Sequence, residues 1–400
     1  MSTSVPPSKT ERIHALDSLR AIMMLLGLVI HSAITYGTFN YSGAWPLKDP
    51  QSNHIFMDYI VYYIHMFRMP IFFVIAGFFG AMLFFERGHK KMLKNRIDRI
   101  LYPLIVFVLI LAPTIKFSSA YSTGMFAQDA NALNAALEPF YYLANWMPER
   151  TYHLWFLYYL FLITIASYAL GLLFERFKPI TEMTTNVLNR ILTKPVMKVL
   201  IFSVMTSLLL LFMGSAWVAT STSWVPDFNT FIFYFFFYGI GWILFKSKEL
   251  LDTFKSYDWV MFVLGTLVFT IRFLLGDSIE QWQIIAMNSL SVWLFIFGIT
   301  GLFIRYGSEH SYLMRYNSDG SYWIYLVHLT MTLLLPAFIV DWGIPAFGKF
   351  VFVLLVTSAI SLVSYHYLVR STFIGKFLNG RKYSIKRKRT KETAVEVKTA

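Results

Sequence analysis

Residues 17–31 read DSLRAIMMLLGLVIH, an apolar run that holds charged or titratable side chains at its two ends. An α-helix turns about 100° per residue, so Arg20, Gly27 and His31 lie along one stripe of its surface. A rise of about 1.5 Å per residue separates Arg20 from His31 by roughly 16 Å, and Gly27 is expected to leave an open space just below the imidazole. An imidazole facing lipid would leave its ring nitrogens without partners, so we predict that this stripe faces the protein interior or a wet cavity.

The composition is that of a multi-pass membrane protein. Of the 400 residues, 56% are hydrophobic and 14% are charged, and the mean hydropathy is +0.54. The absence of cysteine excludes disulfides, thiolate metal sites and a cysteine nucleophile. A formal charge of +13 could indicate nucleic-acid binding, but the basic residues lie between apolar segments and in the C-terminal tail, as membrane topology requires. We therefore predict no nucleic-acid partner and no metal site.

Ten apolar segments are long enough to cross a bilayer. Lysine and arginine gather in alternate connections: the second and the fourth are rich in them, whereas the fifth, 214–227, has none. The positive-inside rule then predicts that both termini are cytoplasmic. The sequence predicts an all-α, polytopic integral membrane protein whose spans are 15–37, 57–85, 100–116, 152–174, 196–213, 228–246, 258–276, 282–304, 321–340 and 346–369.

The predicted spans divide the chain into a membrane domain and two terminal segments. A cytoplasmic segment, 1–14, precedes a ten-helix membrane domain, 15–370, and a basic cytoplasmic tail, 371–400, follows it. The external loop 117–151 is expected to form a short interfacial helix around Asn131–Tyr142, or else a solvated loop. The tail contains Lys386-Arg387-Lys388-Arg389 and is expected to bind anionic lipids of the bilayer.

The second span contains His65 and Arg68, three residues apart and on one face of the helix. The predicted direction of this span brings both side chains near the depth of His31. An arginine within the membrane is costly, so we expect Arg68 to meet an anion. His31, Arg68 and His65 are therefore candidate catalytic residues. The alternative for each is a buried side chain that forms hydrogen bonds within the helix bundle.

Charged residues also gather at the predicted cytoplasmic ends of the first and third spans. Arg96 and Arg99 lie where the third span begins, and two guanidinium groups beside a helix N-terminus can bind phosphate. Ordinary positive-inside anchoring is the alternative. Asp17 is expected to pair with Arg20 at the same face. A ring of Arg20, Arg96 and Arg99 would suit a ligand with a polyphosphate group that enters from the cytoplasm.

Two aromatic segments add further candidates. His153 and Trp155 open the fourth span, and His328 interrupts the ninth. An interfacial aromatic belt explains Trp155 but not His153. We consider all three as residues that bind an acceptor or support the reaction site, and the alternative is structural hydrogen bonding.

The motifs formed by these residues resemble those of the membrane acyltransferase-3 family. The resemblance is strongest to the branch of that family that succinylates glucans. The match covers nearly all ten spans. One departure is Ala76, where many members of the family have serine, so a hydroxyl group cannot be essential at that position. The matching motifs are Arg20 with His31, Arg68 and Pro70 with Phe72-Phe73 and Gly77-Phe78, Arg96 with Arg99, His153-Leu-Trp155, and Tyr325-Leu-Val-His328.

The resemblance implies an O-acyltransferase in the plasma membrane or bacterial inner membrane. It would move an acetyl or succinyl group from a cytosolic acyl-CoA-type donor to a hydroxyl of an extracytoplasmic glycan, with no bound cofactor. His31 would remove the proton of the acceptor hydroxyl or be acylated itself, and the sequence leaves both open. A transporter or flippase for an anionic solute is the competing function, since it would use the same charged groups.

Overall fold

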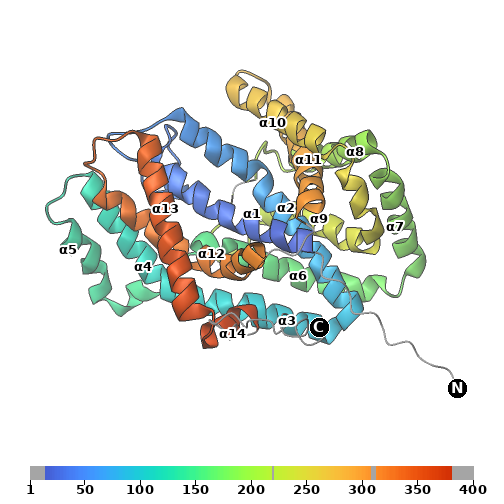
Figure 1. Ribbon diagram of the computed structural model, residues 1–400, viewed down its shortest axis with the longest axis horizontal. Coiled ribbons are helices and arrows are strands. Elements are labelled where there is room, and N and C mark those ends of the chain that lie inside the picture. The colour runs from blue at the N-terminus through green and yellow to red at the C-terminus, as the bar shows by residue number, and fades with distance from the viewer. Residues whose placement is uncertain (1–13, 219, 308–311, 381–400) are drawn as a thin grey trace, which may run out of the picture.

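The computed structural model describes residues 14–218, 220–307 and 312–380, and every regular element in this part of the chain is helical (Figure 1). Ten helices are long and apolar enough to cross a membrane, which confirms the predicted architecture. Residues 1–13 and the basic cluster of the tail lie outside the described residues. The spans are His14–Tyr36 (α1 with η1), Ile55–Arg87 (α2), His89–Phe126 (α3, η3 and α4), Tyr152–Phe174 (η6 and α6), Pro195–Phe212 (α8), Phe228–Lys246 (α9), Asp258–Leu275 (α10), Gln281–Tyr306 (α11), Met314–Phe338 (in α12) and Ala346–Val369 (α13 with η8).

Three short α-helices and several 3-10 turns lie between or after the spans. Helix α5 (Ala132–Leu137) and helix α7 (Lys178–Leu192) lie at opposite ends of the long axis in Figure 1. The positive-inside rule predicts which membrane face of each helix is cytoplasmic. The short elements are η2 (Ser42–Ala44), α5 (Ala132–Leu137), η4 (Glu138–Tyr141), η5 (Leu143–Trp146), α7 (Lys178–Leu192), η7 (Lys248–Lys255) and α14 (Phe373–Asn379).

The third span is longer than predicted, because its helix continues beyond residue 116 to Phe126. The ammonium group of Lys116 donates hydrogen bonds to the carbonyls of Asn145 and Met147 and forms an ion pair with Glu149 at 2.7 Å. A hydrogen bond from Lys116 lowers the pKa of Glu149 below its usual value. With its charge met by the external loop, this lysine does not end the helix. Helix α5 lies within the range where the sequence predicted an interfacial helix.

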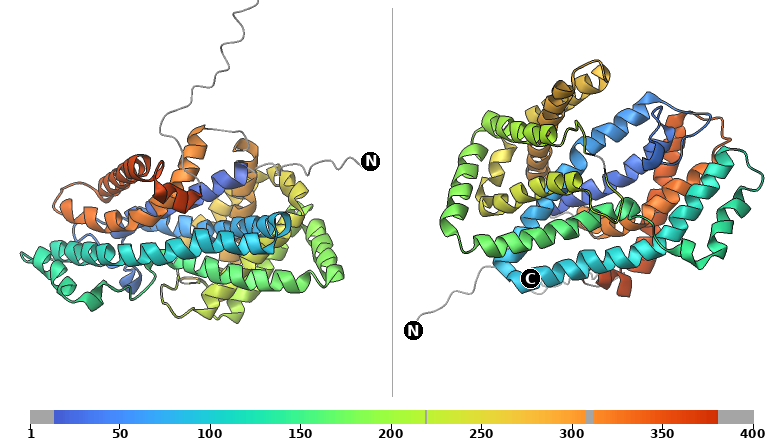
Figure 2. Two further views of the ribbon diagram at one scale, coloured as in Figure 1. Left: turned by 90° about the horizontal axis from the view of Figure 1, so that it is seen from below. Right: turned by 180° about the vertical axis from the view of Figure 1, so that it is seen from behind.

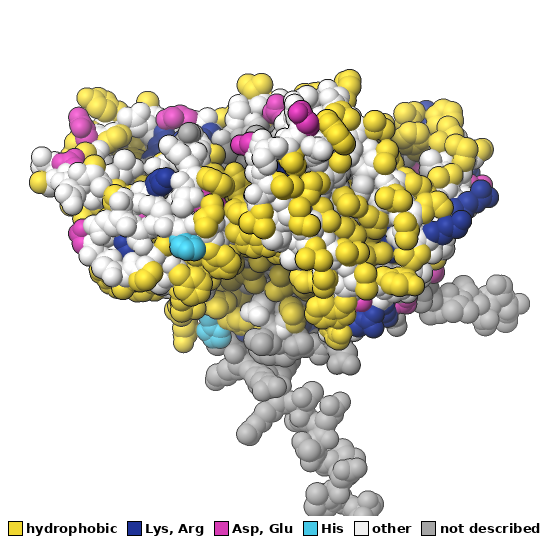
Figure 3. All heavy atoms as spheres, turned by 90° about the horizontal axis from the view of Figure 1, so that it is seen from above, with side chains coloured by type: hydrophobic (Ala, Val, Ile, Leu, Met, Phe, Trp, Pro, Cys, Tyr) yellow, Lys and Arg dark blue, Asp and Glu magenta, His cyan; other side chains and the backbone are white. Residues whose placement is uncertain are grey.

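The spans differ in how far the protein itself encloses them. In the apolar stretch of α2 and of α11, 78% of the residues are buried inside the protein, whereas in that of α10 only 22% are. A helix that is apolar all round belongs in a protein core or against lipid, so α2 and α11 are core helices and we expect α10 to face lipid. Figure 3 shows hydrophobic side chains over much of one face, with lysine and arginine side chains grouped at its right-hand edge.

Helix α1 packs between α2 and α12 near the centre of the bundle, and α2 packs along α9. The long helix formed by α3, η3 and α4 runs beside α6 in both views of Figure 2. These contacts bring α1, α2, α6 and α12 together, and these four helices supply the side chains of the candidate site.

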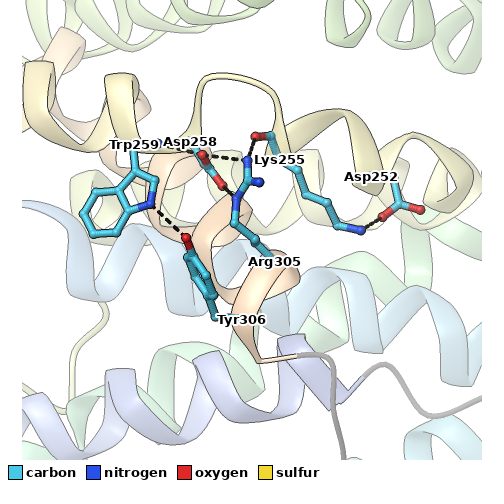
Figure 4. Close-up of polar contacts among 6 residues, drawn as sticks. All are labelled: Asp252, Lys255, Asp258, Trp259, Arg305 and Tyr306. Atoms are coloured by element: carbon cyan, nitrogen blue, oxygen red, sulfur yellow. Dashed lines mark hydrogen bonds and ion pairs between the residues drawn. The ribbon is translucent and has the colours of Figure 1, made fainter.

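The predicted cytoplasmic ends of α10 and α11 are joined by a polar cluster (Figure 4). Arg305 donates to both carboxylate oxygens of Asp258, with Nε to Oδ2 at 2.6 Å, and also to the carbonyl of Lys255. The carboxylate is almost fully buried. A bidentate pair of this kind fixes the relative position of two helix ends, so this basic residue does more than set topology.

Helices α2 and α9 approach so closely that two glycines are needed at their contact. A Cβ atom at Gly77 would meet the backbone carbonyl of Tyr238, and one at Gly241 would meet that of Val74. Gly77 belongs to the Gly-Phe motif noted in the sequence. The motif therefore has a packing role, because backbone atoms cannot move aside as a flexible side chain can.

We expect Gly241→Ala to lower the melting temperature of the purified protein, because the added methyl forces α2 and α9 apart. Overpacking of this kind costs about 1–3 kcal/mol. The matched control is Gly239→Ala, where a Cβ meets nothing within 4 Å. Equal melting temperatures for the two variants in the same detergent would show that the close approach is not required.

Candidate active site

His31 lies near the end of α1, where its imidazole is stacked between two other rings. The ring centroids of His31 and Trp45 are 5.4 Å apart, and those of His31 and His328 are 5.1 Å apart, with interplanar angles of 18° and 6°. His31 Nδ1 lies 2.9 Å from His328 Nε2. His31 is partly exposed, whereas His328 is fully buried. The packing of α1 against α12 thus joins two histidines that lie 297 positions apart in the sequence.

The partners of His328 assign the tautomers of both imidazoles. His328 Nδ1 lies 2.7 Å from the carbonyl oxygen of Tyr325 and 3.0 Å from that of Ile324. Carbonyl oxygens only accept hydrogen bonds, so Nδ1 of His328 carries the proton. Nε2 of a neutral His328 then accepts from His31 Nδ1–H. The nitrogen of His31 with a free lone pair is therefore Nε2, which can take a proton from another molecule.

His153 holds the segment of α12 that carries His328. The Nε2 atom of His153 donates to the carbonyl of Leu326 at 2.9 Å, and the hydroxyl of Tyr325 donates to the carbonyl of His153 at 2.7 Å. These two bonds tie the start of α6 to this turn of α12. The buried Nδ1 atom of His153 has no hydrogen-bond partner in the described part of the chain, which leaves an acceptor beside the two stacked histidines.

Arg68 lies one helical turn below His31. Its Nε atom donates to the carbonyl of Met23 at 2.8 Å, and its guanidinium fills the place that a Cβ of Gly27 would occupy. The sequence predicted an open space beneath the imidazole, and the structure places a cation there. Among the described residues no carboxylate forms an ion pair with the buried Arg68. The charge is therefore available to an anion that enters the site.

The external loop 37–54 places Trp45 over His31. The indole nitrogen of Trp45 donates to Thr35 Oγ1 at 2.9 Å. An ion pair of Asp49 with Lys349, at 2.8 Å and with both side chains fully buried, ties this loop to α13. Sequence reasoning did not select these residues, although Lys349 was visible as a lysine within the tenth apolar segment.

Asp58, in the first turn of α2, holds the beginning of the same loop. Its carboxylate accepts hydrogen bonds from the backbone and hydroxyl of Thr38, at 2.6 and 2.8 Å, and from the hydroxyl of Tyr41 at 2.9 Å. Burial and the neighbouring carboxylate raise the pKa of Tyr41 above its ordinary value, so its hydroxyl stays protonated as a donor. The loop is thus fixed at both ends, which holds Trp45 in position.

A cavity of about 280 Å³ opens below Arg68 toward the predicted cytoplasmic side. The three arginines of the predicted ring all line it, together with Met24, which lies one turn above Arg20 on α1. Its upper walls are apolar, and they include Ala76, the position where the sequence departs from its family. The residues that define the cavity are Arg20, Met24, Phe72, Ala76, Phe79, Asn95, Arg96, Arg99, Ile100, Phe156, Leu157, Leu160, Ser318, Asp319, Ser321, Tyr322, Leu378 and Asn379.

The three arginines differ in their partners. Arg20 pairs with Asp17 at 3.3 Å, as predicted. Arg99 donates to the carbonyl of Leu378 at 2.8 Å and so holds α14 at the cavity mouth. Arg96 has two buried guanidinium nitrogens, Nε and one terminal nitrogen, without a partner in the described chain. Arg96 precedes η3 (Ile97–Leu101), a π-helical turn of the kind that often occurs at functional sites and that the sequence did not reveal.

Two of the predicted site residues lie apart from this cluster. His65 lines a separate small cavity with Trp217, Asn288 and Ser289, and within the described chain it forms no hydrogen bond with the other histidines. Trp155 is buried against Tyr234 of α9, with ring centroids 5.6 Å apart. The structure thus brings together His31, His328, His153 and Arg68 and does not add His65 or Trp155 to them.

Residues 13–366 match the family described as "Acyltransferase domain". Over 158 residues, 40% of the chain, the sequence is 33% identical to "Glucans biosynthesis protein C" of Escherichia coli strain K12 and 32% identical to the protein of that name from Escherichia coli O1:K1 / APEC. The matched stretch spans 38% of the length of these relatives. No solved structure matches the chain. The family match favours an enzyme over a transporter, and this membrane protein belongs to the acyltransferase-3 family whose motifs its spans contain.

Proposed function

We propose that this protein is a transmembrane O-acyltransferase of the cell membrane, that is, of a plasma membrane or a bacterial inner membrane. It moves an acetyl or succinyl group from a cytosolic acyl-CoA-type donor to a hydroxyl of an extracytoplasmic glycan. The observation that carries this proposal is the oriented His31–His328 pair above an arginine-lined cavity that opens to the predicted cytoplasmic side. The name of the E. coli relatives supports a glucan as the class of acceptor.

In the proposed mechanism His31 acts as the general base. Its Nε2 atom removes the proton of the acceptor hydroxyl as the oxygen attacks the thioester carbonyl carbon. The tetrahedral intermediate then collapses, the carbon–sulfur bond breaks, and the protonated Nε2 gives the acceptor's proton to the leaving thiolate, which departs as the free thiol. His328 receives the hydrogen bond from Nδ1–H and stabilises the imidazolium, as the third member of a hydrolase triad does.

Arg68 is proposed to stabilise the negative charge that develops on the thioester oxygen. Its guanidinium is buried one turn below His31, fixed by the carbonyl of Met23, and unpaired with any described carboxylate. A preorganised donor in such a dry site is worth about 3–4 kcal/mol in rate. An enzyme that uses the group in this way gains from the buried cation, which is otherwise costly in the membrane.

The arginine-lined cavity is proposed to bind the donor. The two unpartnered nitrogens of Arg96, with Arg20 nearby, can bind phosphate oxygens at the mouth. The apolar walls above them suit a pantetheine arm, and the distance from Arg20 to His31 along α1 is roughly 16 Å. The acceptor is proposed to approach from the opposite side, where the loop with Trp45 meets His31. The reaction needs no bound cofactor, since the donor is itself a substrate.

Proteoliposomes with succinyl- or acetyl-CoA on one side and a soluble glucan on the other test this function. We expect acyl esters on the glucan, measured by mass spectrometry, together with release of free thiol. His31→Asn should lower turnover about 10²-fold or more, because the general base is lost. His366→Asn, in the π-helical turn η8 (Tyr365–Val369) that follows α13, is the matched control. Passage of the donor or the glucan across the membrane without thiol release would instead establish a transporter.

For His328, a positioning residue, we expect His328→Leu to lower kcat at least about 10²-fold while the KM for the donor stays nearly constant. Leucine cannot accept the hydrogen bond from His31 Nδ1–H, so the base loses its orientation. His328→Gln offers an amide oxygen as acceptor and should recover part of the rate. If leucine and glutamine lower kcat equally, His328 has a packing role alone.

For Gly27, we expect Gly27→Ala to fold normally but to lower kcat about 10²–10³-fold, because its Cβ displaces the guanidinium of Arg68. Donor binding, measured by calorimetry, should change little, since the arginines at the mouth are untouched. Gly239→Ala is the control for adding a methyl within a span. Full activity of Gly27→Ala would show that the position of Arg68 does not matter for the reaction.

A further inference from the structure

A second and larger cavity, of about 480 Å³, lies between α6, α7 and α9. It shares no residue with the arginine-lined cavity, which contacts α6 nearer the other end of that helix. Its lining is mostly aliphatic and aromatic, with hydroxyl groups from α7 and charged side chains at one end. The residues are Phe85, Ser167, Leu170, Gly171, Phe174, Glu175, Lys178, Ile180, Thr181, Thr184, Thr185, Phe235, Gly239, Trp242, Ile243 and Lys246. We refer to this cavity as the α6–α9 groove.

The charged end of the α6–α9 groove is positive. Lys178 and Lys246 line it, and neither forms an ion pair with a carboxylate in the described chain. The ammonium group of Lys246 lies 4.9 Å from the ring centroid of Phe85. Glu175 is the lone carboxylate of the lining, and it is bound to His89 at 3.0 Å. Two ammonium groups are therefore available to one anion.

The length of the groove matches one leaflet of a bilayer. Phe235 and Lys246 both line it and lie on α9, eleven residues apart, which corresponds to roughly 16 Å along the helix. Half of the hydrocarbon core is about 15 Å thick. The groove therefore runs from the level of Lys246, at the predicted cytoplasmic end of α9, to near the middle of the membrane.

The polar groups along the groove select against a peptide or a soluble polar ligand. The hydroxyls of Thr184 and Thr185 donate to the carbonyl of Thr181, and the hydroxyl of Thr181 donates to that of Lys178. These donors are used within α7, so they offer little to a ligand with many polar groups. A ligand with one anionic end and a hydrocarbon remainder matches the chemistry of the groove.

We propose that the α6–α9 groove binds one anionic phospholipid of the cytoplasmic leaflet. The headgroup phosphate lies at Lys178 and Lys246, and an acyl chain follows the aromatic wall toward Phe235. Helix α7 packs against α6, α8 and α9, and so closes the groove on one side. The bound lipid would replace protein packing that this part of the bundle lacks, and the inference does not depend on the reaction catalysed.

The test compares phosphatidylglycerol with phosphatidylcholine as ligands of the full-length protein in detergent, with bound lipid measured by native mass spectrometry. We expect a clear preference for phosphatidylglycerol. Lys178→Gln with Lys246→Gln should weaken its binding roughly 30-fold, equivalent to about 2 kcal/mol. The matched control is Lys248→Gln with Lys255→Gln, two lysines near the same membrane face that pair with Glu86 and Asp252 outside the groove.

A second variant tests the acyl-chain wall without changing charge. A Cβ at Gly239 meets nothing within 4 Å, so Gly239→Leu places its side chain in the groove rather than in a helix contact. We expect it to reduce phosphatidylglycerol binding at an unchanged melting temperature. Binding that is unaffected by both groove variants would overturn the proposal. Displacement of the lipid by millimolar inorganic phosphate would also overturn it, because the site would then recognise a soluble anion.

Discussion

The structure depends on one constraint: the hydrocarbon of a membrane offers no hydrogen bonds, so a polar group there needs a partner supplied by the protein or by what it binds. The imidazole of His328 donates to carbonyls of its own helix and accepts from His31. Arg68 donates to a carbonyl of α1, and His153 donates to a carbonyl of α12. Each of these bonds joins or orients helices, so the groups that the lipid would penalise also define how α1, α2, α6 and α12 are assembled.

The same constraint explains why the site is asymmetric. Toward the predicted cytoplasm, three arginines line a cavity, where a charged ligand could meet them. Toward the outside, loop 37–54 covers the site through Trp45 and is held by the buried pair of Asp49 with Lys349. Both charged groups of a buried ion pair lose their hydration, and their attraction compensates for this loss only when the two groups are close and well oriented. His31 lies between the two environments, which is the position that the proposed reaction between a cytosolic donor and an external acceptor requires of its base.

Glycine has two separate functions in the central helices. At Gly77 and Gly241 it lets two backbones touch, which sets the distance between α2 and α9. At Gly27 it leaves room for a guanidinium group from another helix. Because α2 carries both Arg68 and Gly77, its packing against α9 determines how far Arg68 reaches toward α1. The contact between α2 and α9 therefore supports the candidate site, although its glycines lie outside that site.

The sequence by itself determined the properties that depend on local pattern. Hydropathy and the alternation of basic connections predicted ten spans, because the length of an apolar helix that crosses a bilayer is fixed by the bilayer. The common stripe of Arg20 and His31 follows from helical periodicity alone. The gathering of Arg20, Arg96 and Arg99 also followed from topology, since all three lie at one membrane face.

Only the tertiary structure decided which side chains meet. The partner of His31 comes from a helix almost three hundred residues away, and no local pattern distinguishes His328 from His65, which the fold directs into another cavity. The sequence predicted open space at Gly27, whereas the approach of α2 fills that space with Arg68. Trp45 was not selected because its position depends on a loop fixed by a buried ion pair. Helical periodicity gives the azimuth of a side chain, but the packing of neighbouring helices gives its partner.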